Sequence, residues 1–166
     1  YVYAKMEISP LVLYRDQATL SEACEIKITR RNRFDDGDVQ FPAVEHILIV
    51  PYSGETDLWK MKPSMFSTNL PHGSPEPLRG NDQAGILKIK LQYPQGEYKP
   101  DAVNNEISRE FTSIEQYIVW INKDVEQHNQ QLRGEISRLV KERRERLGAI
   151  QAASSLLNIP IQKRAG

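Results

Sequence analysis

The fold is decided by residues 107–150, whose sequence is ISREFTSIEQYIVWINKDVEQHNQQLRGEISRLVKERRERLGAI. Apolar residues recur along this stretch in the phase of a helix with 3.6 residues per turn, which places them on one side. The members of this apolar stripe are Ile107, Phe111, Ile114, Ile118, Ile121, Val125, Leu132, Ile136, Leu139, Leu147 and Ile150. The pattern predicts a helical part in the C-terminal third of the chain, with its first helix starting near Ala102.

Residues that weaken helix propensity interrupt the stripe between positions 129 and 134. One possibility is a single rod of about 50 residues, which would be ~75 Å long at 1.5 Å per residue. The other is a break into two helices at Asn129 to Gly134, and we favour the break. Asn158 followed by Pro160 predicts the end of the last helix.

Short apolar runs rich in β-branched residues precede the helical part, at positions 8–14, 24–29, 44–50 and 86–93. The second and fourth runs alternate with polar residues, which predicts a sheet with one solvated face and therefore antiparallel strands. The run from Ile47 to Val50 is apolar at every step and is expected to be the central strand. We place Ile47, Ile49, Ile89 and Leu91 in the core.

The segment from Lys62 to Gly85 is rich in proline and glycine, and a loop of this length is uncommon unless it is functional, disordered or contains a short hairpin. The sequence therefore predicts a single α+β module over residues 1–166. Its first part, 1–100, is a small, mostly antiparallel sheet with loops. Its second part, 101–160, is one long helix or two consecutive helices. Because the chain begins with Tyr1, we expect it to be a piece of a longer protein.

The composition excludes several classes of protein. Lysine plus arginine and aspartate plus glutamate both total 22, so no overall field favours nucleic acid or an anionic membrane. The single cysteine, Cys24, cannot form an internal disulfide, and no run approaches the ~18 apolar residues of a membrane span. We therefore expect a cytoplasmic protein without a membrane partner.

Signals for metals and cofactors are weak. The run Asp35-Asp36-Gly37-Asp38 lacks the alternating ligands of a calcium loop, and it is interpreted as a polar turn. The histidines have no local partner at metal-ligand spacing. Neither a phosphate-binding loop nor a nucleophile elbow is present. The sequence thus predicts no metal and no cofactor.

One combination of residues has enzymatic meaning. Asp16 near the end of a strand, followed by Glu25 and Lys27 on the next, has the order found in metal-dependent nucleases. Two carboxylates could hold a magnesium ion while the lysine orients water. Glu25 and Lys27 also point the same way on an alternating strand, which an ordinary solvent face explains equally well. The nuclease reading is therefore kept as the weakest alternative, and no catalytic residue is assigned.

Positions 133–146 are rich in basic residues, with six lysines or arginines and three glutamates. Arg138, Lys141 and Arg144 are the candidate contacts to the phosphates of a nucleic acid. Intrahelical pairs at i,i+4 spacing, Lys141 with Glu145 and Glu142 with Arg146, offer an explanation without a ligand. A nucleic-acid-binding module is thus a second hypothesis.

The apolar stripe is longer than a small sheet can cover, so it is expected to present apolar surface to another chain. The interface residues predicted from this excess are Ile136, Leu139, Arg143 and Leu147. Arg143 lies on the stripe itself, and we expect its stem to pack there while its charge meets an acidic group of a partner helix, which the acidic first helix of this chain could supply. The partner is a second copy or another protein.

Several stretches together resemble the N-terminal module of an uncharacterised group of bacterial proteins, some of which carry a restriction-endonuclease-like domain further along. The matching stretches are Ile8-x-Pro10-Leu11-x-Leu13, Phe41-Pro42, Val50-Pro51-Tyr52-Ser53-Gly54, Leu58-Trp59, Pro63-Ser64-x-Phe66, Trp120-Ile121-Asn122-x-Asp124-Val125 with Asn129 and Leu132, Arg143 to Leu147, Ser155-Leu156 and Ile159-Pro160-Ile161.

The resemblance covers nearly the whole chain in order and spacing. It implies a non-catalytic recognition, assembly or regulatory module of a bacterial defence or restriction-type protein. In those proteins the nuclease signature follows a stretch similar to Leu157-Asn158-Ile159-Pro160.

Overall fold

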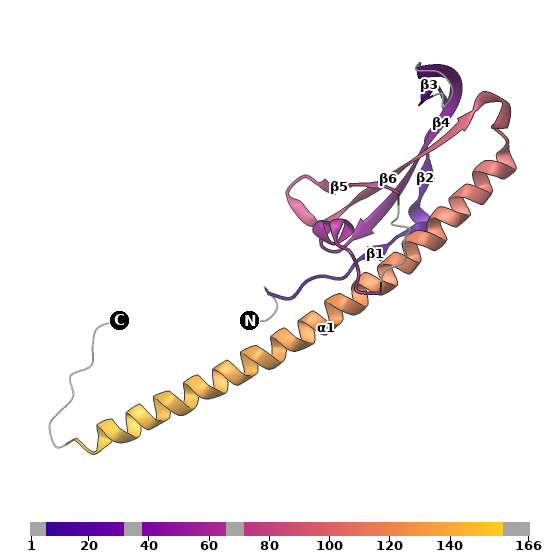
Figure 1. Cartoon of the computed structure of the whole chain (residues 1–166). Coiled ribbons are helices and arrows are strands. Elements are labelled where there is room, and N and C mark those ends of the chain that lie inside the picture. Colours follow the sequence, from indigo (N-terminus) through magenta and orange to yellow (C-terminus); the bar gives the residue numbers. More distant parts are fainter. Residues whose placement is uncertain (1–5, 32–37, 66–71, 158–166) are drawn as a thin grey trace. The chain divides into compact units, whose positions relative to one another are not determined.

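The computed structural model describes residues 6–31, 38–65 and 72–157. Over these residues the chain forms a six-stranded antiparallel sheet followed by one long helix, which confirms the predicted α+β class (Figure 1). The strands are β1 (Val12–Leu13), β2 (Thr19–Leu20), β3 (Cys24–Arg31), β4 (Asp38–Ser53), β5 (Ser74–Leu78) and β6 (Asn81–Pro94). The helices are the short 3-10 turns η2 (Arg15–Gln17), η3 (Thr56–Lys60) and η4 (Gln95–Glu97), and then α1 (Pro100–Ser155).

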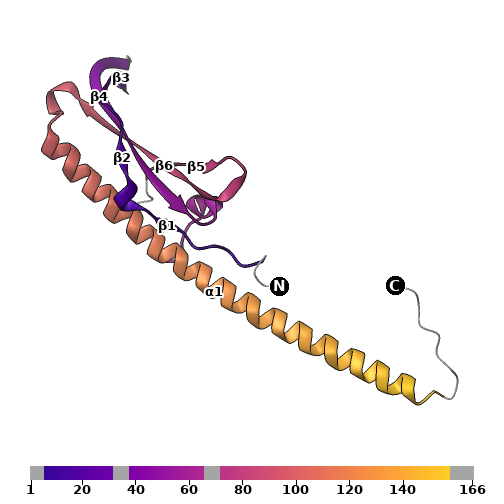
Figure 2. The same cartoon turned by 180° about the vertical axis from the view of Figure 1, so that it is seen from behind.

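The chain divides into two compact units. One comprises residues 8–126, and the other comprises residues 1–7 with 127–166. The first unit contains the whole sheet and the N-terminal half of α1, which runs along one face of the sheet (Figures 1 and 2).

Strand β4 is the centre of the sheet. On one edge it pairs with β6 from Ala43 to Ser53, and β5 pairs with the far edge of β6. On its other edge it pairs in turn with β1, β2 and β3. The apolar run at positions 47–50 lies in this strand, so the predicted central strand is confirmed.

The segment from Lys62 to Gly85 contains a hairpin, which was one of the three interpretations of this proline-rich stretch. Strand β5 pairs antiparallel with β6, and Gly80 in the connecting turn has a φ of 77°. Glycine adopts this backbone conformation without the steric penalty that a Cβ brings. Prolines 75 and 77 lie on an edge strand, where the missing N–H costs no sheet hydrogen bond.

The core lies between the sheet and the helix. Ile89 and Leu91 are buried at 1% exposure each, as predicted. The placement of Ile47 and Ile49 in the core is wrong, because side chains alternate along a strand and their neighbours Leu48 and Val50 take the helix-facing side. Ile47 and Ile49 lie half-buried on the opposite face, in register with Lys90 and Lys88.

The predicted break in the helical part is also wrong. Helix α1 is continuous from Pro100 to Ser155 and passes through Asn129 and Gly134. A glycine in a helix costs only about 1 kcal/mol relative to alanine, whereas two new helix ends would leave several backbone groups without intrahelical partners. The helix begins two residues before Ala102 and ends before Asn158.

A side-chain amide of α1 joins the helix to the start of the sheet. The Nδ2 group of Asn122 donates to the carbonyl of Leu11 (2.7 Å), and its Oδ1 accepts from the amide of Leu11 (2.8 Å). The amide group thereby satisfies both backbone groups of Leu11, whose side chain is 1% exposed. Buried backbone groups require such partners, so this contact fixes where the first strand segment can lie.

Two further helix side chains hold the segment after β4. Asp124 accepts hydrogen bonds from the amide of Ser64 (2.7 Å) and from its hydroxyl, and these bonds lower the pKa of Asp124. The hydroxyl of Tyr117 lies within hydrogen-bond distance of the carbonyls of Leu58 and Met61. Burial raises the pKa of Tyr117 to about 12, so its phenol remains a donor.

Gly54 allows the chain to approach itself closely after β4. Its φ is 106°, and a Cβ at this position would lie 2.2 Å from the carbonyl oxygen of Pro10. Any other residue would force these two segments apart. Gly54, Leu11, Ser64, Asn122 and Asp124 are therefore all explained by how this unit is held together.

The amide contact predicts a measurable loss of stability. Asn122→Ala leaves the buried backbone groups of Leu11 unpaired, so we expect the free energy of unfolding to fall by about 1–3 kcal/mol in urea denaturation. Asn105→Ala, at an exposed site on the same helix, is the matched control because it makes the same change in helix propensity. Equal stabilities of the two variants would contradict the role of Asn122.

The alternation along β4 predicts opposite outcomes for neighbouring substitutions. Val50→Asp buries an unpaired charge at a position that is 0% exposed and should lose more than about 4 kcal/mol, enough to unfold the chain. Ile49→Asp lies on the half-buried face opposite Lys88 and should remain folded. Circular dichroism melts distinguish them, and unfolding of both variants would refute the assigned facing of β4.

Candidate functional site

The candidate site is the part of the apolar stripe beyond position 126. We call it the distal stripe and define it as Leu132, Ile136, Leu139, Arg143, Leu147 and Ile150. Within the described chain, no side chain between positions 127 and 155 is buried. Leu139 and Leu147 are each 53% exposed, and Ile150 is 55% exposed. Leu132 and Ile136 are half-buried. Of the three predicted apolar interface residues, Leu139 and Leu147 are therefore exposed, and Ile136 is partly exposed.

The same periodic pattern is covered in the first unit. There, α1 buries Val103, Phe111, Ile114, Tyr117, Ile121 and Val125 against the sheet. The last of these is Val125, and the distal stripe begins seven residues later at Leu132. One continuous sequence pattern thus consists of a part that is buried within the first unit and a part in the second unit that has no buried side chain in positions 127–155.

An uncovered helix of this kind needs another source of stability. Helices without tertiary packing are marginal in water, because most helical stability in proteins comes from burying an apolar face. Gly134 and Gly148 each lower the helix propensity by ~1 kcal/mol relative to alanine. Exposed ion pairs on a helix contribute only ~0.3–0.5 kcal/mol each. The distal part of α1 therefore depends mainly on any surface that covers its stripe.

Several basic residues in positions 133–146 form ion pairs. Arg138 contacts Glu142 at 2.8 Å and Glu135 at 3.4 Å, and these contacts raise the pKa of Arg138. Lys141 lies 3.9 Å from Glu145, which confirms that predicted pair. The predicted pair of Glu142 with Arg146 is not formed, because Glu142 turns back to Arg138. Two of the three candidate phosphate contacts, Arg138 and Lys141, therefore already have acidic partners.

Three arginines of this segment form no ion pair with the residues that the structure describes. Arg143, Arg144 and Arg146 are exposed and have no acidic partner within 4.0 Å in the described part of the chain. Arg143 lies on the distal stripe between Leu139 and Leu147. An acidic partner for it was predicted on another helix.

Arg133 has a different role. Its guanidinium binds the carboxylate of Glu7 through both Nε and Nη2, and the Nη2 contact is 3.0 Å. The contact lowers the pKa of Glu7 and fastens the segment before β1 to the helix within the second unit. Sequence analysis could not identify this pair, because the two residues are 126 positions apart and neither belongs to a motif.

The nuclease candidates do not lie together. Glu25 and Lys27 are exposed neighbours on one side of β3, where Glu25 pairs in register with Val44. Asp16 lies in η2, just before Thr19, which pairs with Ile49. The five residue steps along β4 from Val44 to Ile49 span ~16 Å, so Asp16 cannot share a cation with Glu25.

The histidines are accounted for individually. His46 is 7% exposed, and both ring nitrogens have partners, the Ser21 carbonyl and the Tyr98 hydroxyl, each at 2.9 Å. His72 and His128 are exposed. Within residues 6–31, 38–65 and 72–157, no group of three His, Cys, Asp or Glu side chains could hold a metal ion. The run at positions 35–38 lies largely outside these residues.

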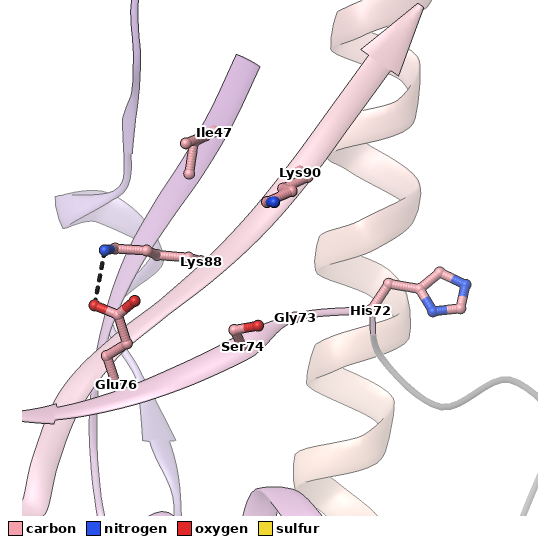
Figure 3. A pocket seen from close by; sticks show the side chains of 7 residues that line it. All are labelled: Ile47, His72, Gly73, Ser74, Glu76, Lys88 and Lys90. Carbon is pink, nitrogen blue, oxygen red and sulfur yellow. Dashed lines mark ion pairs between the residues drawn. The ribbon is translucent and has the colours of Figure 1, made fainter. Parts of the chain in front are cut away.

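A shallow depression of about 480 Å³ lies on the sheet face opposite the helix. Its lining is Ile47, His72, Gly73, Ser74, Glu76, Lys88 and Lys90. Figure 3 shows Lys88 reaching Glu76, at 2.7 Å, while the ring of His72 points away from the depression. Because Glu76 neutralises Lys88, the charged groups here do not converge on a ligand position.

No protein-family model, curated protein or solved structure matches this chain. No helix in the described ranges has both the length and the apolar character needed to cross a membrane.

The separation of Asp16 from Glu25 generates a prediction. We expect the chain, incubated with magnesium or manganese, to leave single- and double-stranded DNA and RNA intact. Glu25→Ala should change the free energy of unfolding by no more than about 0.5 kcal/mol, as expected for an exposed strand residue.

Electrophoresis of the nucleic acid is the measurement. Cleavage that is lost in Glu25→Ala and Lys27→Ala, but retained in the remote surface variant Lys99→Ala, would overturn this expectation.

Proposed function

We propose that this chain is a non-catalytic assembly module whose distal stripe packs against a helix of another chain. The observation that carries the proposal is the absence of any buried side chain in described positions 127–155, on a helix whose apolar stripe continues through them. A contiguous exposed apolar surface is the usual mark of a protein interaction site. An amphipathic helix of this form is most simply covered by a second helix.

The free energies of burial and of association support a specific interaction of moderate affinity. Burying a Leu or Ile side chain contributes ~1.5–3 kcal/mol, so the apolar members of two facing stripes could contribute on the order of 10 kcal/mol. The loss of freedom on association costs ~4–15 kcal/mol. Because these terms are similar, removing two apolar members of the stripe should be enough to prevent assembly.

The biological setting is part of the proposal. The resemblance to modules that precede restriction-endonuclease-like domains supports a cytoplasmic defence or restriction-type protein. In such a protein, assembly through the distal stripe would set how many effector domains act together. This control of an effector by assembly is the regulatory role that we propose.

A second candidate function is nucleic-acid binding by the same helix. The observation that favours it is the set of three arginines, Arg143, Arg144 and Arg146, without acidic partners in the described structure. Binding to a DNA duplex that weakens steeply with salt and is reduced by Arg144→Gln would support this function over assembly alone.

Assembly predicts a change in molecular mass. The double variant Ile136→Glu, Leu139→Glu places two charges on the distal stripe, so we expect its mass by multi-angle light scattering to fall to that of one chain. The unchanged protein should show a higher mass that depends on concentration. Because neither residue packs in the sheet core, urea unfolding of the first unit should be unaffected.

The matched control is Gln131→Glu, Ser137→Glu, which adds the same charge at exposed positions away from the stripe. This variant should assemble like the unchanged protein. A single-chain mass for the unchanged protein would refute assembly with itself, and equal dissociation of both double variants would refute the role of the stripe.

A further inference from the structure

The distal part of α1 has the spacing of a coiled-coil seam. Steps of three and four residues alternate without interruption, which is the heptad arrangement of core positions. The seam positions are Asn129, Leu132, Ile136, Leu139, Arg143, Arg146 and Ile150. The seam therefore has an aliphatic half and two consecutive arginines, both exposed in this chain.

A parallel partner of the same sequence fits this seam poorly. With two copies in register, Arg143 would face Arg143 of the second copy, and the next layer would repeat the conflict at Arg146. Like charges that meet in a desolvated seam are strongly unfavourable. The flanking glutamates give no compensation, since Glu135 and Glu142 would face Val140 and Leu147 of the second copy.

An antiparallel second copy removes this conflict. If Arg143 is aligned with Leu139 of the second copy, the same register aligns Arg146 with Ile136 and Ile150 with Leu132. Each arginine stem then covers an aliphatic side chain, as long basic side chains do at apolar surfaces. The two-fold symmetry repeats every contact, so both halves of the seam are filled.

The charges of the helix also become complementary in this register. Glu135 precedes Ile136 by one residue, so it lies beside the layer that receives Arg146 of the second copy. Glu142 is one turn from Leu139 and lies beside Arg143 of the second copy. Both glutamates now contact Arg138, but these contacts are exposed and can be exchanged for interchain pairs at little cost.

We infer that this seam, which shares all members of the distal stripe except Leu147, binds a second copy of this chain in antiparallel orientation, with Arg143 of one chain against Leu139 of the other. The inference rests on the proposed assembly function and adds the identity of the partner, its direction and its register.

Disulfide trapping tests the direction. In a Cys24→Ser background, which removes the exposed native thiol, Leu132→Cys and Ile150→Cys are prepared as separate proteins. Each is oxidised alone and in an equimolar mixture, and the products are identified by intact mass. Antiparallel pairing brings position 132 next to position 150 of the other copy, within the Cα separation that a disulfide needs. We expect the mixed disulfide to predominate in the mixture and little crosslinking of either protein alone.

The possible results distinguish the antiparallel register from assembly itself. Homodimeric disulfides from each protein alone, without the mixed product, would overturn the antiparallel inference and leave assembly intact. Crosslinking no greater than that of the outward-facing control Ser137→Cys, in a protein that still has the mass of an oligomer, would overturn the register. A single-chain mass in the absence of oxidant would instead refute the proposed function.

A charge exchange provides a second test. Replacing both Arg143 and Arg146 with Glu should weaken association at least about tenfold, because carboxylates then face carboxylates. Adding Glu135→Arg and Glu142→Arg should restore it, since the complementary pattern is recovered with its signs reversed. If the variant with all four substitutions does not regain the dissociation constant of the unchanged protein for self-association, the proposed pairing is contradicted.

Discussion

The amide of Asn122 is the contact on which the first unit depends. It supplies both hydrogen-bonding groups to Leu11, a buried residue that no strand pairs with in the described chain. Together with Tyr117 and Asp124 it makes one helix surface the attachment point for the segments on either side of β4. These attachment residues are required by the fold itself, so their presence in another protein would indicate a shared architecture and would not by itself indicate a shared chemistry.

Sequence analysis recovered the class of fold and the helix phase because both depend on apolar periodicity. The sequence-based prediction was wrong where two different structures are compatible with the same sequence pattern. The run Ile47 to Val50 is apolar at every step, so alternation could not indicate which residues face the helix. Asn129 and Gly134 lower helix propensity without abolishing it, and the cost of two new helix ends exceeds theirs. The hairpin after Lys62 was only one of several possible interpretations, because its prolines suit an edge strand and a loop equally well.

The position of the candidate site on the helix could be predicted from the sequence, but the length of its uncovered part could not. Ile136, Leu139 and Leu147 follow from the stripe, whereas its uncovered length depends on how far the sheet reaches, which no local pattern encodes. The sequence also does not determine which charged residues form ion pairs. Glu142 has arginines four residues away on both sides, and spacing alone does not distinguish Arg138 from Arg146. Asp16 and Glu25 are near in sequence, but β2 and β3 pair at different points along β4, and only that register shows that they are apart.

The distance along the chain between Asn122 and Leu11 affects the order in which the protein can be made. These partners are 111 positions apart, and the helix that covers the inner sheet face is synthesised after all the strands described here. At ~5–20 residues per second, a ribosome needs on the order of ten seconds to add the intervening chain. During that interval Leu48, Val50 and Leu87 have no cover, and the backbone groups of Leu11 have no partner. Until α1 emerges, the nascent chain exposes the kind of apolar surface that makes folding intermediates prone to aggregation.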